Sequence, residues 1–302
     1  CVANLLLFIS LYVLFPVLSV EMADRLGVPA AQTGVIFLFF TLGMFLIGPF
    51  HAYLVDAYKR KYVCMFAAAL MVVATIGYAF VTNLTELILL GTVQGLAFGI
   101  GTTAGITLAI DITNSTLRSA GNVSFSWMAR MGMIAGIILG VWLYQSQSFQ
   151  TLLTVSVITG AVGILMLSGV YVPFRAPIVT KLYSFDRFLM LRGWVPAINL
   201  ILITFIPGLL VPMVHPFLND FVLGNTGIPV PFFVGTALGY IVSLFFARLF
   251  FLKEKTLRLV IIGLGLEIVA MSLLNTDISI GISSVLLGLG LGFILPEFLV
   301  MF

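Results

Sequence analysis

Long apolar runs separated by short polar connections dominate the chain, and they predict membrane-spanning helices. A helix needs about 20 apolar residues to cross the hydrocarbon core of a bilayer. Backbone polar groups in lipid must be satisfied internally, so each such run is expected to be helical. The runs number ten and cover residues 2–20, 34–55, 62–81, 87–110, 123–144, 152–172, 194–217, 229–252, 257–274 and 278–302. The first is not expected to be a signal peptide, because many spans follow it and no small-residue cleavage site is evident.

Composition agrees with this pattern. Hydrophobic residues make up 61% of the 302 residues and charged residues 8%, whereas a soluble domain carries about 25% charged residues. The net charge of +3 gives no support to a nucleic-acid partner. With only two cysteines, Cys1 and Cys64, and two histidines, a disulfide framework or a Cys/His metal site is not expected. We therefore predict an all-α integral membrane protein, a monomer in the lipid bilayer, with no cofactor and no metal.

Basic residues predict the orientation of these spans. Cytoplasmic loops of membrane proteins carry an excess of Lys and Arg. The odd-numbered connections hold only Arg25. The even-numbered connections hold, or lie beside, Lys59, Arg60, Lys61, Arg118, Arg175, Lys181, Arg187, Arg192, Arg248, Lys253, Lys255 and Arg258. This asymmetry places the even-numbered connections and the N-terminal side of the chain in the cytoplasm, in a multi-pass protein of the bacterial inner membrane.

The connection between the sixth and seventh runs differs from the others. It is long and carries four basic residues and two prolines. It predicts a division into an N-terminal six-helix bundle at 1–172, a cytoplasmic linker at 173–193, and a partial C-terminal bundle of four helices at 194–302. Secondary transporters are often built from two repeated halves with the substrate site between them.

The segment 52–61 resembles a signature of the major facilitator superfamily of secondary transporters. The signature lies between the second and third helices and combines glycines, an aspartate and two basic residues. Asp56, Arg60 and Lys61 match it, whereas Ala52, Ala57 and Lys59 replace two glycines and an arginine. The resemblance implies a conformational latch between the two halves, formed by Asp56, Arg60, Lys61, Asp111 and Arg118.

Two further segments resemble motifs of the same family. Gln94 and the glycine after it fit the end of a motif on the fourth helix, although Gly91 stands where the family has an arginine. Three glycines on the fifth span, Gly132, Gly136 and Gly140, are spaced by four and predict close helix packing. The family's exporters carry a glycine-rich motif here with a proline after the middle glycine, a position that Ile137 occupies in this chain. Members of the family have twelve helices in two bundles, so two further helices are expected beyond Phe302.

Ionisable and polar groups within the spans are candidates for substrate binding or coupling, because such groups are costly in a membrane. Arg130, with Trp127 one turn before it, could bind an anion or sense a protonated acid. Glu267 in the ninth span could exchange protons near neutral pH. A structural ion pair or a snorkelling side chain is the alternative for Arg130. For Glu267, the resemblance argues against coupling, because the ninth helix of the resembling fold lies on the outside of the bundle.

The remaining candidates depend on the resembling fold or on single residues. Helices one, four, seven and ten surround the substrate path in that fold, which favours Asn4, Tyr12, Gln94 and Glu297 as lining residues. His215 lies between two prolines in the seventh span and could shuttle protons, although a simple hydrogen-bonded histidine is the alternative.

Transport of a small molecule by alternating access is the leading hypothesis, with proton-coupled export by an antiporter preferred. Uptake of a sugar or organic anion is the second hypothesis, and Arg130 favours it for anions. A membrane-embedded enzyme is the third, but no nucleophile-elbow, zinc-protease or nucleotide-binding motif occurs in the sequence. The expected partners are therefore a small-molecule substrate, protons and lipid.

Overall fold

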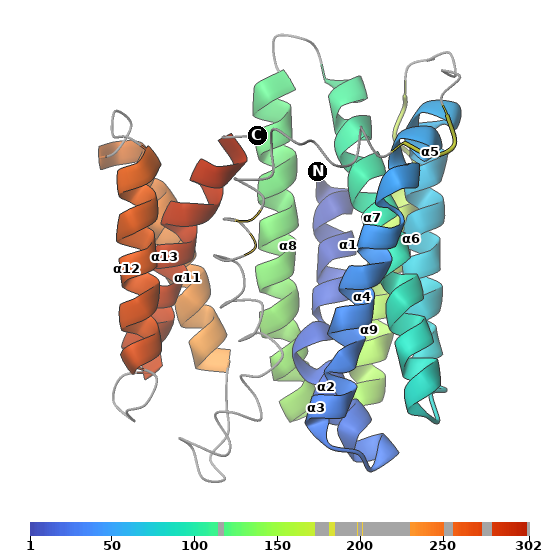
Figure 1. Cartoon of the computed structure of the whole chain (residues 1–302), viewed down its shortest axis with the longest axis horizontal. Helices are drawn as coiled ribbons and strands as arrows, with labels where there is room; N and C mark the ends of the chain where they lie inside the picture. The colour runs from blue at the N-terminus through green and yellow to red at the C-terminus, as the bar shows by residue number, and fades with distance from the viewer. Residues whose placement is uncertain are drawn as a thin grey trace. The chain divides into compact units, whose positions relative to one another are not determined.

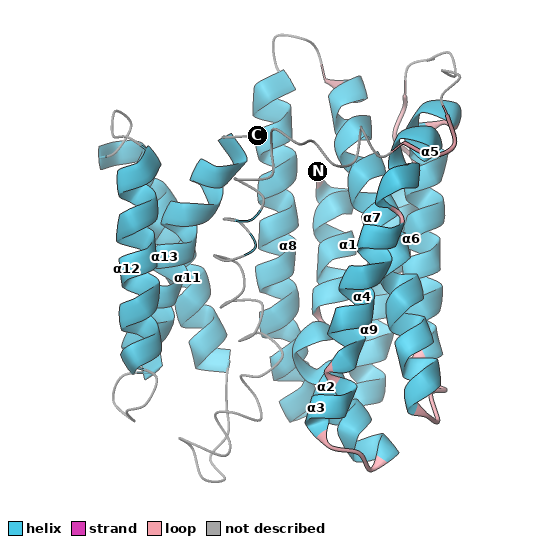
Figure 2. Ribbon diagram, in the orientation of Figure 1, coloured by secondary structure: helices cyan, strands magenta, loops and turns pink. Residues whose placement is uncertain are grey.

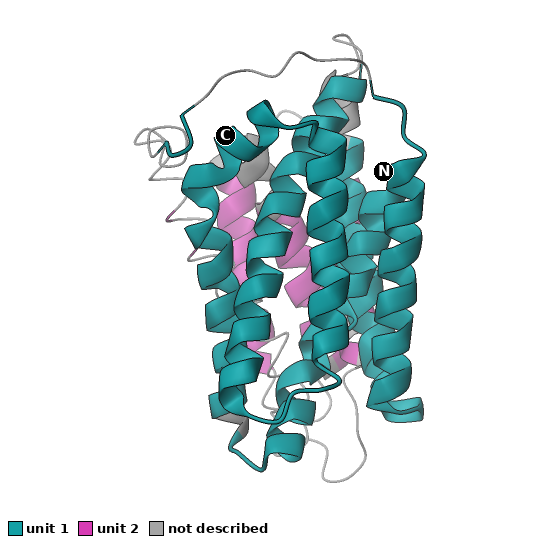
Figure 3. Cartoon of the chain, turned by 90° about the vertical axis from the view of Figure 1, so that its right-hand side faces the viewer, with its two compact units in different colours: residues 1–190 teal, residues 191–302 magenta. Residues whose placement is uncertain are grey.

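The computed structural model describes residues 1–113, 118–172, 181–184, 198, 201, 230–250, 256–273 and 280–300. Within these ranges the regular structure is helical throughout, without strands (Figure 2). The chain divides into two compact units, residues 1–190 and residues 191–302 (Figure 3).

Unit 1 contains the first six spans. Its elements are α1 (Val2–Tyr12), α2 (Phe15–Leu26), α3 (Ala30–Thr33), α4 (Val35–Leu46), the 3-10 turn η1 (Gly48–Phe50), α5 (His51–Ala57), α6 (Arg60–Gly77), α7 (Leu84–Ile112), α8 (Arg118–Ser146) and α9 (Phe149–Ser168) (Figure 1). In the described part of the chain, six helices or helix pairs are long and apolar enough to cross a membrane: Val2–Leu26, Val35–Ala57, Arg60–Gly77, Leu84–Ile112, Ser124–Ser146 and Phe149–Ser168. The prediction of an all-helical membrane protein is confirmed.

Prolines break two of these spans, which the hydrophobic pattern predicts as continuous. The first span changes from α1 to α2 just before Pro16, and the second contains η1 around Pro49. Proline lacks a backbone N–H, so the carbonyl four residues earlier loses its helical hydrogen bond. The first two spans therefore each consist of two helical segments.

Unit 1 is built from two sets of three spans. In one set, α1 packs against α8 and α9, and in the other α7 packs against α4 and α6. The contact between α6 and α9 joins the two sets. Two buried serines fasten α1 to α9, because each hydroxyl donates to the other's backbone carbonyl: Ser10 Oγ to Ser156 O (2.7 Å) and Ser156 Oγ to Ser10 O (2.5 Å).

Unit 2 contains α11 (Val230–Phe250), α12 (Thr256–Leu273) and α13 (Ile280–Val300). These helices correspond to the predicted eighth, ninth and tenth spans. α13 packs against both α11 and α12. The predicted seventh span, 194–217, lies outside the described residues except for Ile198 and Ile201, so the total of ten spans stays a prediction.

Glycines bring the backbones of two helix pairs into direct contact. On α7, a side chain at Gly95 would collide with the backbone carbonyl of Phe40 on α4. On α13, a side chain at Gly288 would collide with the backbone carbonyl of Thr236 on α11. Small residues permit such close approach in membranes. The second and fourth spans of unit 1 are thus joined in the same way as the predicted eighth and tenth spans of unit 2.

Candidate functional site

A charged cluster joins the ends of α5, α6 and α7. Arg60 is the first residue of α6, and its Nη1 donates to Asp111 Oδ1 on α7 at 2.8 Å. Its Nη2 lies 3.4 Å from Asp56 Oδ1 on α5. The same guanidinium donates from Nη1 to Thr107 O at 3.2 Å and from Nε to Val55 O at 3.4 Å. One arginine therefore binds two carboxylates and two backbone carbonyls from the neighbouring helices.

Partial burial and helix dipoles strengthen this cluster. The Arg60, Asp56 and Asp111 side chains are only 11%, 17% and 18% exposed. The carboxyl ends of α5 and α7 carry partial negative charge, which a guanidinium stabilises. Charge-assisted hydrogen bonds shielded from water are stronger than neutral ones. The structure thus brings together three of the five residues expected to form the latch.

The other two residues expected in the latch are placed differently. Lys61 Nζ donates to Ser168 O (2.6 Å) and Val170 O (2.8 Å), so it caps the carboxyl end of α9. A lysine at this position satisfies carbonyls that the helix leaves unpaired. In this structure Lys61 therefore joins α6 to α9 and does not contribute to the Arg60 cluster. Arg118 begins α8, and its side chain lies outside the described residues.

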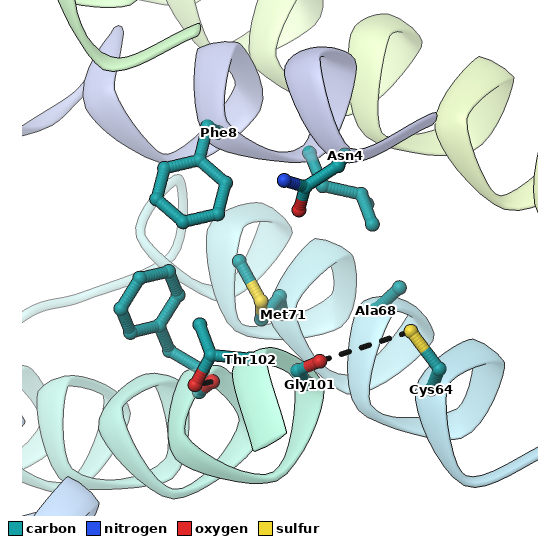
Figure 4. Close-up of a pocket in the computed structure, with 9 residues that line it drawn as sticks. Asn4, Phe8, Cys64, Ala68, Met71, Gly101 and Thr102 are labelled. Carbon is teal, nitrogen blue, oxygen red and sulfur yellow. Dashed lines mark hydrogen bonds between the residues drawn. The ribbon is translucent and has the colours of Figure 1, made fainter. Parts of the chain in front are cut away.

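A pocket lies between the two three-span sets of unit 1 (Figure 4). It is a half-open hollow whose interior has room for about one water molecule. Its lining residues come from α1 (Asn4, Leu7, Phe8), α6 (Cys64, Ala68, Met71) and α7 (Phe98, Gly101, Thr102). None of these side chains is charged. Asn4 Nδ2 donates to Phe125 O on α8 at 3.0 Å, and the Cys64 thiol donates to Gly101 O at 3.8 Å. The lining of the pocket is thus uncharged and largely apolar.

A chain of aromatic rings bounds this pocket. Phe8 on α1 contacts Phe98 on α7 with ring centroids 5.4 Å apart, and both residues line the pocket. The contacts continue through further rings on α1, α2 and α4, namely Tyr12, Phe15, Phe37 and Phe40. Aromatic pairs at such distances stabilise packing beyond their buried area. Tyr12, expected to line the substrate path, is thus part of the contact between α1 and the set formed by α4, α6 and α7.

Gln94, also expected to line the substrate path, is buried between α6 and α7. Only 1% of its surface is exposed. Its Oε1 accepts from the Tyr78 hydroxyl at 2.8 Å, and its Nε2 donates to Thr75 Oγ1 at 3.3 Å. The expected lining role does not fit this arrangement, because both ends of the amide are satisfied by α6. Gln94 is a packing residue in this conformation.

The glycines of the fifth span lie against α1, where close packing was expected. A side chain at Gly132 would come within 2.5 Å of Leu5 O, and one at Gly136 within 2.9 Å of Tyr12 Cβ. Gly140 meets the Val13 carbonyl in the same way. These three glycines therefore let α8 and α1 approach at backbone distance.

Arg130 and Trp127 are half-buried on the same helix and do not line the pocket. Successive helical residues are rotated by about 100°. Arg130 is therefore rotated by about a third of a turn from the middle of the glycine face that meets α1.

The remaining candidates belong to unit 2 or to parts of the chain outside the described residues. Glu267 on α12 is 0% exposed, and neither carboxyl oxygen has a hydrogen-bond partner among the described residues. Glu297 is on α13, but its side chain lies outside the described residues. His215 also lies outside them.

Two residues with structural roles were missed from the sequence. Arg25 donates to the carbonyls of Tyr78 (2.9 Å), Ala79 (3.1 Å) and Val81 (3.2 Å), so it caps the carboxyl end of α6. In the sequence, Arg25 is the single basic residue of the odd-numbered connections, and this exception could have drawn attention to it. His51 on α5 lies with Nδ1 3.2 Å from Thr103 Oγ1. A histidine inside an apolar run was the signal there.

Part of the long connection lies against the break in the second span. Ser184 N donates to Pro49 O at 3.1 Å, and the Tyr183 ring meets the Phe50 ring edge-on at 5.5 Å. The connection predicted as a linker therefore contacts η1, next to the helix that carries Asp56.

Comparison with known proteins shows which family has this arrangement of helices, glycine contacts and a charged hairpin. The model of the Major Facilitator Superfamily matches residues 1–302. The chain belongs to this family. The expected resemblance to major facilitator transporters is thereby confirmed, and the chain is a secondary transporter of the membrane. A search of curated proteins found no match.

Solved structures share the fold. A D-xylose–proton symporter has a TM-score of 0.74 at 14% identity, over 97% of this chain and 78% of that one. The nucleoside transporter NupG has a TM-score of 0.73 at 16% identity, over 99% and 81%. A bacterial homologue of the human lysosomal transporter Spinster, in an inward-facing and unoccupied conformation, has a TM-score of 0.69 at 16% identity, over 98% and 72%. At these identities the likeness concerns the fold alone.

Proposed function

We propose that this major facilitator transporter exports a small, uncharged or weakly polar solute in exchange for protons. The Arg60 cluster supports alternating access, because one guanidinium holds the ends of three spans together through hydrogen bonds that can be remade. Transporters of this kind expose a central site to each side in turn. The cluster is the observation on which the proposal depends most.

Two features support the solute class and the direction. The pocket of unit 1 is lined by uncharged and mostly apolar side chains, which favours a solute that carries no full charge. The close contact of Gly132, Gly136 and Gly140 with α1 supports export, because the family's exporters have a glycine-rich motif on this helix, although Ile137 replaces the proline of that motif.

Uptake of a sugar is the second candidate function. Two of the structures with the same fold belong to a D-xylose–proton symporter and a nucleoside transporter. A symporter would move solute and proton in the same direction, whereas an exporter of the proposed kind would move them in opposite directions. Uptake of an organic anion would require Arg130 to face the substrate path.

The direction of an imposed pH gradient separates these candidates. We would reconstitute the complete protein in liposomes and test D-xylose, uridine, lactate and tetraphenylphosphonium. Accumulation driven by an acidic interior supports exchange for protons, and accumulation driven by an acidic exterior supports symport. Solute movement that neither gradient affects would refute proton coupling and would indicate a facilitative transporter. Arg60→Ala serves as the control in which alternating access is impaired.

A further inference from the structure

The side chain of Glu267 lies in the contact between α12 and α13. It is 0% exposed. On α13, a Cβ at Gly290 would come within 2.9 Å of Glu267 Cγ and 2.7 Å of the Gly263 carbonyl oxygen. The glutamate therefore occupies the space that a side chain on the facing helix would otherwise fill.

No charged group stabilises this carboxyl among the described residues. Neither Oε1 nor Oε2 has a hydrogen-bond partner there. α13 is the element packed against α12, and its residues 281–294 include no ionisable side chain. On α12 itself the other ionisable residue is Arg258, nine positions earlier and thus about 14 Å away along the axis. The described side chains of α11 add Tyr240, whose backbone contacts α13 on its other face at Gly288 and Gly292.

The corresponding contact in unit 1 buries a polar group of a different kind. There Gln94 lies between the third and fourth spans, and both ends of its amide are hydrogen-bonded to Tyr78 and Thr75. In unit 2 a carboxyl takes the polar position between the predicted ninth and tenth spans and has no such partners among the described residues. Packing alone explains the glutamine, but it does not explain an acid.

The physical chemistry of burial determines which form of the acid this site holds. An isolated carboxylate in an apolar environment is far more costly than a neutral polar group, and such a group takes up a proton instead. Glu267 is eleven residues from one end of α12 and six from the other, about 16 Å and 9 Å along the axis. It therefore lies well away from both ends of an apolar helix that is predicted to span the membrane.

We propose that Glu267 is the residue at which this transporter binds its coupling proton. The carboxyl holds the proton while α12 and α13 are packed as in this structure. When the two helices separate enough for water to enter, the O–H bond breaks, water accepts the proton, and the carboxylate keeps the electron pair. This inference rests on the proposed proton coupling and assigns a site to it.

Infrared difference spectroscopy on the complete protein in liposomes tests the proposal without a solute. The carbonyl stretch of a protonated carboxyl is separate from that of a carboxylate. We expect this band at neutral pH, its loss in Glu267→Gln, and its shift when H2O is replaced by D2O. Glu86→Gln is the matched control, because Glu86 is an exposed acid whose carboxylate accepts hydrogen bonds from Thr82. The control should leave the band unchanged.

Labelling of the unmodified protein gives a second measurement that does not depend on a variant folding. Dicyclohexylcarbodiimide is apolar and adds to protonated carboxyls, so mass spectrometry should locate it on Glu267 and not on Glu86. A band that persists in Glu267→Gln, a band that does not shift in D2O, or an unlabelled Glu267 would each overturn the proposal.

The transport measurement separates this proposal from the function on which it rests. If Glu267 is not protonated and the pH gradient still drives solute movement, the proton site lies elsewhere and the proposed function stands. If Glu267 exchanges its proton but no gradient drives any solute, proton coupling is refuted together with the role of Glu267 in it. If both hold, Glu267→Gln should lose the response to the gradient and keep solute exchange.

Discussion

Replacing Arg60 with alanine should destabilise unit 1, and most of the loss should come from the contact with Asp111 and less from the contact with Asp56. The hydrogen bond from Nη1 to Asp111 Oδ1 is 2.8 Å long, whereas Asp56 Oδ1 lies 3.4 Å from Nη2, although both contacts join neighbouring spans. A hydrogen bond involving charged groups contributes about 1.5–3 kcal/mol. Asp56 and Arg60 stand on different helices and their contact is longer, so its contribution lies at the low end of the about 0.2–1 kcal/mol measured for ion pairs that water reaches.

Burial adjusts these magnitudes. Removing one partner of a fully buried ion pair costs about 3–5 kcal/mol. The three side chains of this cluster are 11–18% exposed, so water can replace part of the lost interaction. We therefore expect Arg60→Ala to lower the free energy of unfolding by about 2–3 kcal/mol. Arg60→Lys should lose part of this amount, because an ammonium cannot reproduce the planar fork of the guanidinium.

Double-mutant cycles directly measure the difference between the Arg60–Asp111 and Arg60–Asp56 contributions. Combining Arg60→Ala with Asp111→Asn should give a coupling energy of about 1–2 kcal/mol, and combining it with Asp56→Asn should give less than about 0.5 kcal/mol. Unfolding by SDS in mixed micelles, followed by tryptophan fluorescence, supplies the free energies. Equal couplings, or a larger one for Asp56, would show that the contact between α6 and α7 does not dominate the cluster.

Three further predictions concern helix contacts. Gly95→Ala should cost about 1–3 kcal/mol in a thermal unfolding assay, because its methyl group meets a backbone carbonyl. Gly265→Ala, a control on α12 of unit 2 with nothing within 4 Å, should hold stability or raise it by up to about 1 kcal/mol. Gln94→Leu should cost about 1–3 kcal/mol by leaving the Tyr78 hydroxyl without its acceptor; an unchanged unfolding temperature would contradict this. Arg25→Ala should speed amide hydrogen exchange at the end of α6, with Arg25→Lys restoring part of the protection.

The spans could be predicted because one property, apolar length, decides whether a helix crosses a bilayer. All nine predicted spans that fall on described helices coincide with them to within six residues at either end. The breaks around Pro16 and Pro49 were not predicted, since a proline in a membrane helix is compatible with continuation, a kink or a break. Only the hydrogen bonds of the surrounding backbone decide among these outcomes.

Candidate site residues could be found in the sequence from their residue type, but the residues that they contact could not be predicted. Glu267 and Arg60 stand out in the sequence because charge in or beside an apolar run is costly. The structural contacts of Lys61 and Gln94 depend on which helix faces them, and that information is three-dimensional. The glycines of α7 were likewise visible in sequence, but their contact with α4 follows only from how the spans pack.

The close contacts made by Gly95, Gly140 and Gly288 bear on how far such sequences can diverge. At these positions the facing backbone leaves no space for a side chain, so substitution is severely restricted. Many other side chains, such as Leu38, are exposed and would face lipid, where any apolar residue of similar size serves equally well. A chain in which few positions restrict substitution and many tolerate it can keep its fold while most of its sequence changes. This explains how structures that share only 14–16% of their residues with the chain superpose on nearly its full length.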